Sequence, residues 1–497
     1  MKINNEYNYC FNGRTKIYAL ADTHQESRKT ATFLTKIIQS KEKKQNILML
    51  HCGDFFRGIY PKELERDCYI KMKEANPDIE MVMTLGNNDF GYDKKGFDFL
   101  VDTVKNFTSK GIKVVCANIL EPTGKRPDWV KPYTIVERDG DKNFITGFCI
   151  NDLQARGLKN IASISQIDAI DELKSAIEKE KPDNVIILNH DFLPSSEKII
   201  DYCKSKKINI DLLIGGHDHR LIPPNEGAKI YQPVAYAQTM YEFDLLNNYG
   251  KKNIENISET KYETTELDKI FKTDIEVFEQ KNGLFDTVAP SIIDLRHTYS
   301  APCSYGTFFA DSIKEAADTD IGFVSTGFIQ QSLEYKPNGI ITNYDLIKSM
   351  PTETPVQVVN LSASELKNVF NHAYKTYQFS EGNPRFLQCS NNIEIIGHKN
   401  NKLKKFEVSQ ILINNEPLFD HNGNPINETK TYSCAIDSFI ANGGQQFTML
   451  QEQEKEVLMI DNKTSKINEI LKDAIIDAPN KYSKGEKYPS FKINDSI

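Results

Sequence analysis

Short apolar runs alternate with polar stretches up to about residue 245. Several of these runs are rich in valine, isoleucine and leucine and only a few residues long, as expected for buried strands. They occupy residues 16–21, 46–51, 81–85, 113–118, 143–150, 184–189 and 211–214. The stretches between them include 26–40 and 167–181, which are long enough for helices. Strands that alternate with helices predict a layered α/β fold.

A polar segment separates this region from a second one with apolar patterns of its own. Residues 259–279 carry apolar side chains at helical spacing, which predicts a charged connecting helix. Apolar patterns resume after about residue 300, for example at 361–377 and 410–413. At 497 residues the chain is longer than one hydrophobic core usually supports. We therefore expect one domain at 1–258, a linker helix and connection at 259–298, and a second domain at 299–497.

Composition narrows the classes of partner. Hydrophobic residues make up 39% of the chain and charged residues 26%, as in ordinary globular proteins. The formal net charge of -8 is spread without a basic stripe, so we expect no nucleic-acid partner. No apolar run approaches the roughly 18 residues that cross a bilayer, so no membrane partner is expected.

The cysteines and the N-terminus bear on the compartment. The nine cysteines are scattered without a Cys-x-x-Cys pair, which favours reduced thiols over a disulfide framework. Residues 1–10 lack the apolar core of a signal peptide. We therefore expect a cytoplasmic protein, or a periplasmic or secreted one if a leader has been removed.

Seven side chains with metal-binding chemistry follow five of the apolar runs. They are Asp22 and His24 in Ala-Asp-Thr-His, Asp54 in Cys-Gly-Asp, Asn87 in Gly-Asn-Asn-Asp, His190 in Leu-Asn-His-Asp, and His217 and His219 in Gly-Gly-His-Asp-His. Each block alone is weak, because Gly-Asp commonly forms turns and paired histidines also occur in surface loops. Together they can converge at one edge of a sheet. Carboxylate, amide and imidazole ligands, with one carboxylate able to bridge, suit a two-metal site that cleaves phosphate esters.

In this order the blocks resemble those of the calcineurin-like metallophosphoesterases, and among them the 5'-nucleotidase and UDP-sugar hydrolase family. The resemblance covers nearly the whole chain. It implies a four-layer α/β sandwich with a dimetal site, followed by a smaller α/β domain that recognises the substrate. It also implies a metal-dependent hydrolase of phosphoric esters or anhydrides, monomeric or homodimeric. The substrate is expected to be a small phosphorylated molecule, a nucleotide or nucleotide derivative.

The resemblance also implies the ligand sets. One divalent ion would be held by Asp22, His24, Asp54 and His219, and Asp54 would bridge to a second ion held by Asn87, His190 and His217. Zn, Mn, Fe, Co or a Ca and Mg mixture all fit these donors, although the histidines argue against a pure Mg site.

One block departs from the family pattern at the position expected to be catalytic. Relatives place a histidine where this chain has Asn88, and an orienting aspartate where it has Gly91. Asparagine donates a hydrogen bond but cannot supply a proton, and general acid–base catalysis typically contributes about 10²–10⁴-fold. We expect a slowed or redirected hydrolase that favours anhydride or diester bonds. His51 is a candidate replacement acid, although a strand histidine in the core is the simpler interpretation.

The second domain resembles the family's substrate-recognition domain but also departs from it. Phe386 and Phe439 stand where relatives stack a nucleobase between two aromatic rings. Gln330 replaces an arginine that faces phosphate, and Gln445 replaces an aspartate that contacts ribose. An alternative therefore stays open, in which an impaired homologue binds a metal-chelated phosphorylated ligand without turning it over.

Overall fold

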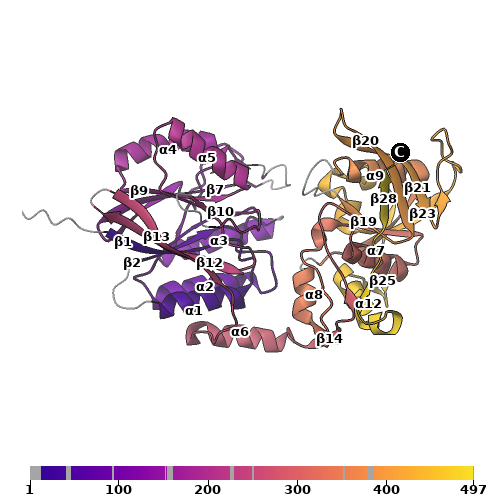
Figure 1. Cartoon of the computed structure of the whole chain (residues 1–497), viewed down its shortest axis with the longest axis horizontal. Helices are drawn as coiled ribbons and strands as arrows, with labels where there is room; N and C mark the ends of the chain where they lie inside the picture. The colour runs from indigo at the N-terminus through magenta and orange to yellow at the C-terminus, as the bar shows by residue number, and fades with distance from the viewer. Residues whose placement is uncertain are drawn as a thin grey trace, which may run out of the picture. The chain divides into compact units, whose positions relative to one another are not determined.

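The computed structural model describes residues 13–40, 46–91, 94–151, 153, 160–223, 229–248, 251–350, 353–377 and 386–495. The chain forms two compact units, Met1–Phe278 (unit 1) and Glu279–Ile497 (unit 2). Figure 1 shows their elements coloured along the chain. Within the described ranges, no helix is long and apolar enough to cross a bilayer.

Unit 1 contains two sheets. The first has the strand order β13 (Lys251–Lys261), β12 (Thr239–Asn248), β1 (Gly13–Leu20), β2 (Asn46–Cys52), β3 (Glu80–Thr84) and β4 (Lys113–Val114). The second has the order β11 (Ile230–Tyr231), β10 (Leu212–Gly216), β9 (Asn184–His190), β7 (Asp141–Cys149) and β6 (Tyr133–Arg138). Strands β1 to β4 are parallel, as are β7, β9, β10 and β11. A small pair, β5 (Ile119–Leu120) and β8 (Ala162–Ser163), completes the unit.

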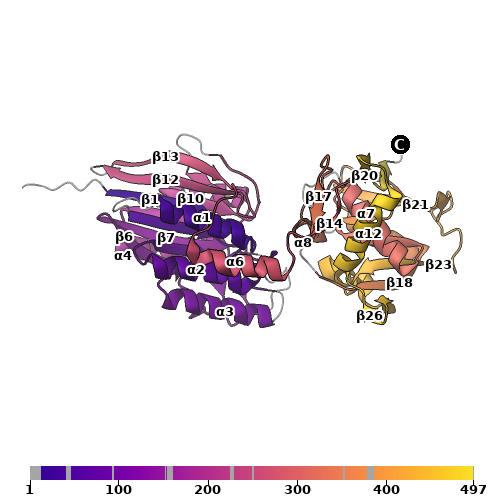
Figure 2. The same ribbon diagram turned by 90° about the horizontal axis from the view of Figure 1, so that it is seen from below.

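Helices cover the outer faces of both sheets (Figures 1 and 2). On the first sheet lie α1 (Ser27–Gln39), α2 (Lys62–Ala75) and α3 (Lys94–Ser109), and on the second lie α4 (Gln166–Glu180) and α5 (Leu193–Ser205). Ile17 and Leu48 of the first sheet pack with Leu188 and Ile214 of the second in one buried cluster. The layers are therefore helix, sheet, sheet, helix, which confirms the predicted four-layer α/β sandwich.

The predicted helix at 259–279 is wrong at its start. Residues 259–261 continue strand β13 and pair with β12, and helix α6 (Lys269–Lys281) begins later. This edge strand is polar on both faces, so its sequence carries no alternating apolar signal. Where α6 does form, Phe271 and Ile275 are buried and the ring of Phe278 lies 5.4 Å from that of Tyr60. The polar face of α6 carries Asp274, which pairs with Lys71.

Unit 2 is also α/β. Its larger sheet has the order β19 (Leu387–Cys389), β16 (Ile321–Ser325), β23 (Thr431–Asp437), β18 (Val356–Ser362) and β24 (Lys455–Val457). The second sheet has the order β22 (Glu416–Pro417), β21 (Lys405–Ile413), β20 (Ile393–Asn400) and β28 (Lys492–Asp495). Three two-stranded pairs join β14 (Thr287–Pro290) to β17 (Ile340–Thr342), β15 (Ile293–Asp294) to β27 (Glu486–Lys487), and β25 (Met459–Ile460) to β26 (Lys463–Thr464).

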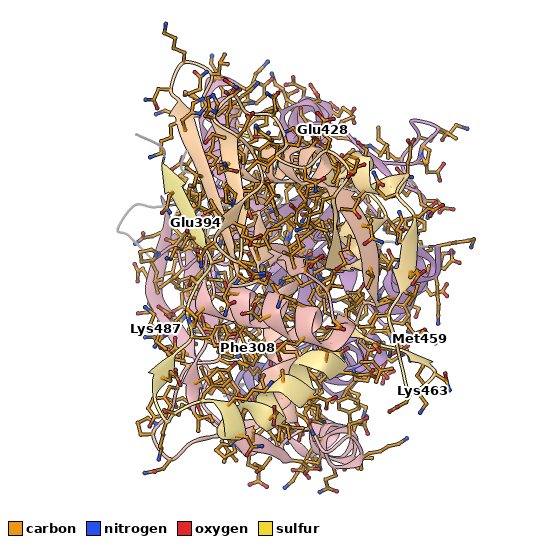
Figure 3. All side chains as sticks on the ribbon, turned by 90° about the vertical axis from the view of Figure 1, so that its right-hand side faces the viewer. Phe308, Glu394, Glu428, Met459, Lys463 and Lys487 are labelled. Atoms are coloured by element: carbon orange, nitrogen blue, oxygen red, sulfur yellow. The ribbon has the colours of Figure 1, made fainter. Side chains whose placement is uncertain are left out.

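Helices pack on both faces of the larger sheet of unit 2. They are α7 (Ser304–Ala317), α8 (Asn343–Ser349), α9 (Ala363–Tyr374), α10 (Ser438–Ala441), α11 (Thr448–Gln451) and α12 (Ile467–Lys481). Two short 3₁₀ turns lie at Thr326–Phe328 and Gly444–Gln446. Figure 3 labels Phe308 on α7, Glu394 on β20, and Met459 and Lys463 on the β25–β26 hairpin. The capping box of Ser362 and Glu365 fixes the start of α9.

Candidate metal centre

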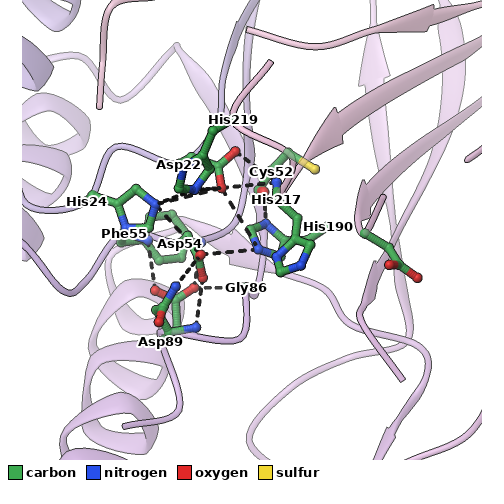
Figure 4. Close-up of polar contacts among 12 residues, drawn as sticks. Asp22, His24, Cys52, Asp54, Phe55, Gly86, Asp89, His190, His217 and His219 are labelled. Carbon is green, nitrogen blue, oxygen red and sulfur yellow. Dashed lines mark hydrogen bonds and ion pairs between the residues drawn. The ribbon is translucent and has the colours of Figure 1, made fainter. Parts of the chain in front are cut away.

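The seven candidate ligands lie at the carboxyl ends of parallel strands of both sheets, three strands in the first and two in the second, rather than at the edge of one sheet as predicted. Asp22 and His24 follow β1, Asp54 follows β2, Asn87 follows β3, His190 ends β9, and His217 and His219 follow β10. Ten of the twelve residues drawn in Figure 4 are labelled there, including six of these ligands. Asp22, His24, Asp54, His217 and His219 have positive φ angles of 49°, 48°, 55°, 81° and 60°. Backbone strain of this kind concentrates at functional sites, where the surrounding fold enforces it.

Six of the seven side chains form two groups with metal-binding geometry. In each group the ligand atoms lie within 4.8 Å of one another. The first group is Asp22, His24, Asp54 and His219, and the second is Asp54, His190 and His217. Asp54 belongs to both, as a bridging carboxylate must.

Distances within the two groups are those of atoms that face a common point. In the first group, His24 Nε2 lies 3.8 Å from Asp54 Oδ2, and His219 Nε2 lies 3.7 Å from Asp22 Oδ1. In the second group, His190 Nε2 lies 3.3 Å from Asp54 Oδ2. The Nε2 atoms of His24 and His219 lie 3.0 Å apart. Two imidazole nitrogens that approach each other this closely must share a proton or a cation.

Hydrogen bonds at the outer ring nitrogens prepare two histidines for a cation. Nδ1 of His190 lies 2.7 Å from the carbonyl oxygen of Cys52, and Nδ1 of His24 lies 3.3 Å from that of Phe56. A carbonyl only accepts, so the proton sits on Nδ1 and leaves the Nε2 lone pair for a metal. Asn87 Oδ1 is buried without a hydrogen-bond partner among the described residues. These donors fit a pair of divalent cations.

Because the carboxylates and imidazoles of the centre are buried, their pKa values depend on the charges that lie next to them. Burial raises the pKa of Asp22 to about 8. Burial alone would lower the pKa of His190, but the neighbouring Asp54 carboxylate outweighs it and raises that pKa to about 10. Metal binding requires ionised carboxylates and neutral imidazoles, so cations and protons compete for the same atoms.

Asp89 positions the bridging residue, a role that the sequence analysis missed. Its buried carboxylate accepts hydrogen bonds from the backbone N–H groups of Asp54, Phe55 and Phe56, at 3.0, 2.8 and 3.1 Å. It also accepts one from Gly86, at 2.8 Å. Four donors on one carboxylate tie the loop after β3 to the loop after β2. Its place in the Gly-Asn-Asn-Asp block was the only sequence signal.

The residues around Asn88 agree with the loss of a histidine–aspartate dyad. The side-chain amide of Asn88 donates to Asp54 Oδ2 over 2.7 Å, so this residue does lie at the centre. Gly91 has φ 65°, and a Cβ there would lie 2.7 Å from the Cα of Gly96. A side chain at position 91 therefore does not fit this loop. His51 is fully buried against the rings of Phe55 and Tyr69, so it is a core residue.

The predicted substrate residues of unit 2 are only partly brought together. Phe439 is 48% exposed, and its ring lies 6.2 Å from that of Phe328. The Gln445 amide accepts from Ser325 Oγ at 3.3 Å, and Gln330 Nε2 donates to the carbonyl of Gly327 at 2.8 Å. Both glutamines thus border the same turn, Thr326–Phe328.

Phe386 does not belong to this surface, so its prediction as a stacking residue is wrong. Its side chain is fully buried in a hydrophobic cluster, with its ring 5.0 Å from Tyr374 and 6.4 Å from Phe491. No face of the ring is left for a ligand. The preceding residues 382–385 of the motif lie outside the described residues.

Comparisons with known proteins agree with both units. The family model described as calcineurin-like phosphoesterase matches residues 15–221, and that of the 5'-nucleotidase C-terminal domain matches residues 282–452. The chain is 24% identical to an apyrase of Tabanus yao over 480 residues, covering 86% of this chain and 82% of the relative. It is 23% identical to the 5'-nucleotidase of Rattus norvegicus over 482 residues, covering 85% and 79%.

The solved structures agree on the fold. The 5'-nucleotidase precursor from Thermus thermophilus is similar with a TM-score of 0.72 and 17% identity, over 97% of this chain and 99% of that chain. Fold and site together define a metallophosphoesterase. With a matching C-terminal domain, the chain belongs to the 5'-nucleotidase family, and it is a phosphoester hydrolase of that family.

Proposed function

We propose that the protein hydrolyses phosphoric esters or anhydrides of nucleotides at a two-metal centre built on Asp54. The observation that carries the proposal is the pair of ligand groups that share this carboxylate. When bound, two divalent cations neutralise phosphate oxygens and activate water for attack on phosphorus. The protein's own residues hold the cations, orient the phosphate and decide how the leaving group departs.

Asn88 determines which leaving groups the site tolerates. Its amide lies at the bridging carboxylate but has no proton to give. A sugar alkoxide needs a proton as it leaves, whereas a phosphate leaves as a stable anion without help. The site therefore favours anhydride bonds, from which a phosphate leaves, over the ester bond of a nucleoside monophosphate. Without a general acid, the rate of monophosphate hydrolysis should be lower by about 10²–10⁴-fold.

A nucleotide is the proposed substrate class because unit 2 offers an exposed aromatic ring beside two amides. Phe439 supplies one face for stacking on a base, and Gln445 and Gln330 supply neutral hydrogen-bonding groups. The names of the relatives, apyrase and 5'-nucleotidase, agree with this class. Neither glutamine carries a charge, so unit 2 contributes little to the recognition of phosphate through these two positions.

The second candidate function is a binder that retains a metal-chelated phosphorylated ligand without hydrolysing it. It is favoured by Asn88 and Gly91, which leave no proton donor at the expected position. The complete ligand set favours the enzyme, since five strained backbone positions are maintained around it.

A substrate screen on metal-free protein supplied separately with Mn, Co, Zn or Mg distinguishes the two. The substrates are a nucleoside monophosphate, its diphosphate, a cyclic nucleotide, a sugar nucleotide and a phosphodiester. The proposal predicts metal-dependent phosphate release that is faster from the diphosphate than from the monophosphate. Equal turnover of the two contradicts the role given to Asn88, and tight binding without turnover supports the second candidate.

A further inference from the structure

We propose that Arg57 binds a phosphate oxygen of the substrate and, together with Asn88, forms the phosphate-recognition element of this centre. The inference rests on the proposed function and names a residue that the metal ligand set does not include. It follows from the contacts, the charge and the backbone of Arg57.

Contacts place the guanidinium one residue away from the bridging carboxylate. An Nη1 group of Arg57 donates to Asn88 Oδ1 over 3.0 Å, while Asn88 Nδ2 donates to Asp54 Oδ2 over 2.7 Å. The backbone N–H of Asn88 donates to the other carboxylate oxygen of Asp54 over 2.8 Å. The amide of Asn88 is oriented by both neighbours, because arginine only donates and a carboxylate only accepts. The chain Arg57–Asn88–Asp54 therefore has one consistent arrangement.

The charge of Arg57 is not used by the protein itself. No carboxylate of the described chain lies within 4.0 Å of its guanidinium, and the residue is exposed. One of its five N–H donors is used by Asn88, which leaves donors for a ligand. Phosphate oxygens are the natural partners of such a group.

The backbone holds Arg57 in a conformation that a non-glycine residue rarely adopts. Its φ angle is 76°. On one side, Phe56 N–H donates to Asp89, and on the other, Gly58 N–H donates to Gln25 Oε1 over 2.7 Å. Position 58 admits only glycine, since a Cβ there would lie 1.6 Å from the carbonyl oxygen of His24. The hydrogen bonds on both sides hold the backbone of Arg57 in a strained conformation and so fix the position of its Cα. Strain of this kind is typical of functional positions.

The guanidinium of Arg57 supplies a positive charge that Asn88 lacks, but it does not supply the missing proton. It stays charged and does not donate its proton, so it stabilises negative charge on phosphoryl oxygens without protonating a leaving group. A site that stabilises charge but donates no proton suits a substrate whose leaving group departs as an anion.

The test measures affinity for inorganic phosphate by calorimetry on Mn-loaded full-length protein, beside kcat/KM for a nucleoside diphosphate. Arg57→Ala removes the charge, Arg57→Lys restores it without the planar fork, and Arg57→Gln keeps a donor for Asn88. Arg66→Ala is the matched control, because Arg66 is a cation on α2 of the same unit that pairs with Asp67 over 2.8 Å and has no part in the metal centre. Bound Mn is counted in every variant.

We expect Arg57→Ala and Arg57→Gln to weaken phosphate binding about 10- to 100-fold with bound Mn unchanged, the loss of a charged hydrogen bond. Arg57→Lys should lie between them and the wild type, and Arg66→Ala should match the wild type. In a cycle with Asn88→Ala, the two losses should not add, because Asn88 positions the guanidinium. Equal phosphate affinity in wild type and Arg57→Gln, or an equal loss in Arg66→Ala, overturns the inference.

The two proposals fail in different ways. If the wild type binds phosphate through Arg57 but hydrolyses none of the substrates, the hydrolase proposal fails and the arginine inference stands. If the wild type hydrolyses the diphosphate and Arg57→Gln does so with the same kcat/KM and phosphate affinity, the arginine inference fails alone. A variant that loses Mn or melts early shows a structural role and also counts against it.

Discussion

Asn88 holds both carboxylate oxygens of Asp54, through its side-chain amide at 2.7 Å and its backbone N–H at 2.8 Å. A carboxylate has about four lone-pair directions, so two remain for cations. Asn88 thus fixes the one residue that both ligand groups share. The residue that departs from the family pattern also organises the centre.

Replacing this residue by histidine should change the preference for leaving groups. An imidazole with an ordinary pKa near 6.5 can donate a proton, so Asn88→His should raise monophosphate hydrolysis about tenfold relative to diphosphate hydrolysis. The gain stays below that of a complete dyad because Gly91 leaves the ring without an orienting carboxylate. The new activity should fall as the pH rises through the pKa of the imidazole. Asn88→Gln is the control, and an unchanged ratio of the two rates would refute the role of Asn88.

Asp89→Asn should weaken metal binding, because Asp89 positions the backbone around Asp54. Four backbone N–H groups share the Asp89 carboxylate, and an amide offers only one accepting oxygen to them. Each buried donor left unsatisfied costs about 1–3 kcal/mol. We expect lower thermal stability and about 10- to 100-fold weaker metal affinity, measured by titration with Mn. Asp98→Asn, at an exposed site of α3, serves as the comparison, and unchanged metal affinity in Asp89→Asn would contradict the positioning role.

The two phenylalanines of unit 2 should respond differently to truncation. Phe439→Ala removes a half-exposed ring and should weaken nucleotide binding by about 1–3 kcal/mol with little effect on unfolding. Phe386→Ala empties a fully buried site and should lower the free energy of unfolding by about 3–5 kcal/mol. Ligand titration and thermal unfolding measure the two effects. Undiminished binding by Phe439→Ala would remove the base-stacking proposal.

His51→Phe should leave hydrolysis intact and reduce the acid sensitivity of folding. Burial lowers the pKa of His51 to about 3 from its ordinary value of 6.5. The unfolded chain therefore binds a proton that the folded chain refuses, and stability present above pH 6.5 is lost as the pH falls toward 3. Between pH 7 and pH 5 the wild type should lose about 2 kcal/mol of its free energy of unfolding through His51, and His51→Phe should not lose this amount. Urea unfolding at pH 7 and pH 5 measures this difference. A large loss of hydrolysis in His51→Phe would show instead that His51 takes part in the reaction.

Much of the metal centre could be predicted because its chemistry is local in sequence. Each ligand block directly follows an apolar run, and in each of the two sheets the parallel strands bring their carboxyl ends to one edge. Asp22 and His219 lie far apart in the chain but meet because β1 of the first sheet and β10 of the second, which pack against each other, end side by side. The alternation of strands and helices predicted a layered α/β fold, and the resemblance to the family implied its four layers.

What could not be predicted depends on contacts between distant residues. Phe386 matches a motif, yet Tyr374 and Phe491 enclose it, and no local pattern reports that burial. The contribution of Arg57 depends on the fold of the loop around Gly58 and on its distance to Asn88. Residues 259–261 form a strand only because β12 pairs with them.

The most direct test of the central claim is phosphate release from a nucleoside diphosphate by wild type and Asp54→Asn, with bound metal counted in the same samples. The wild type should bind two divalent ions and release phosphate only in their presence. Asp54→Asn should bind fewer ions and release phosphate at a rate at least about 10³-fold lower, because both ligand groups share this carboxylate. Release that persists in chelator-treated wild type, or at the wild-type rate in Asp54→Asn, would contradict a hydrolase built on this centre.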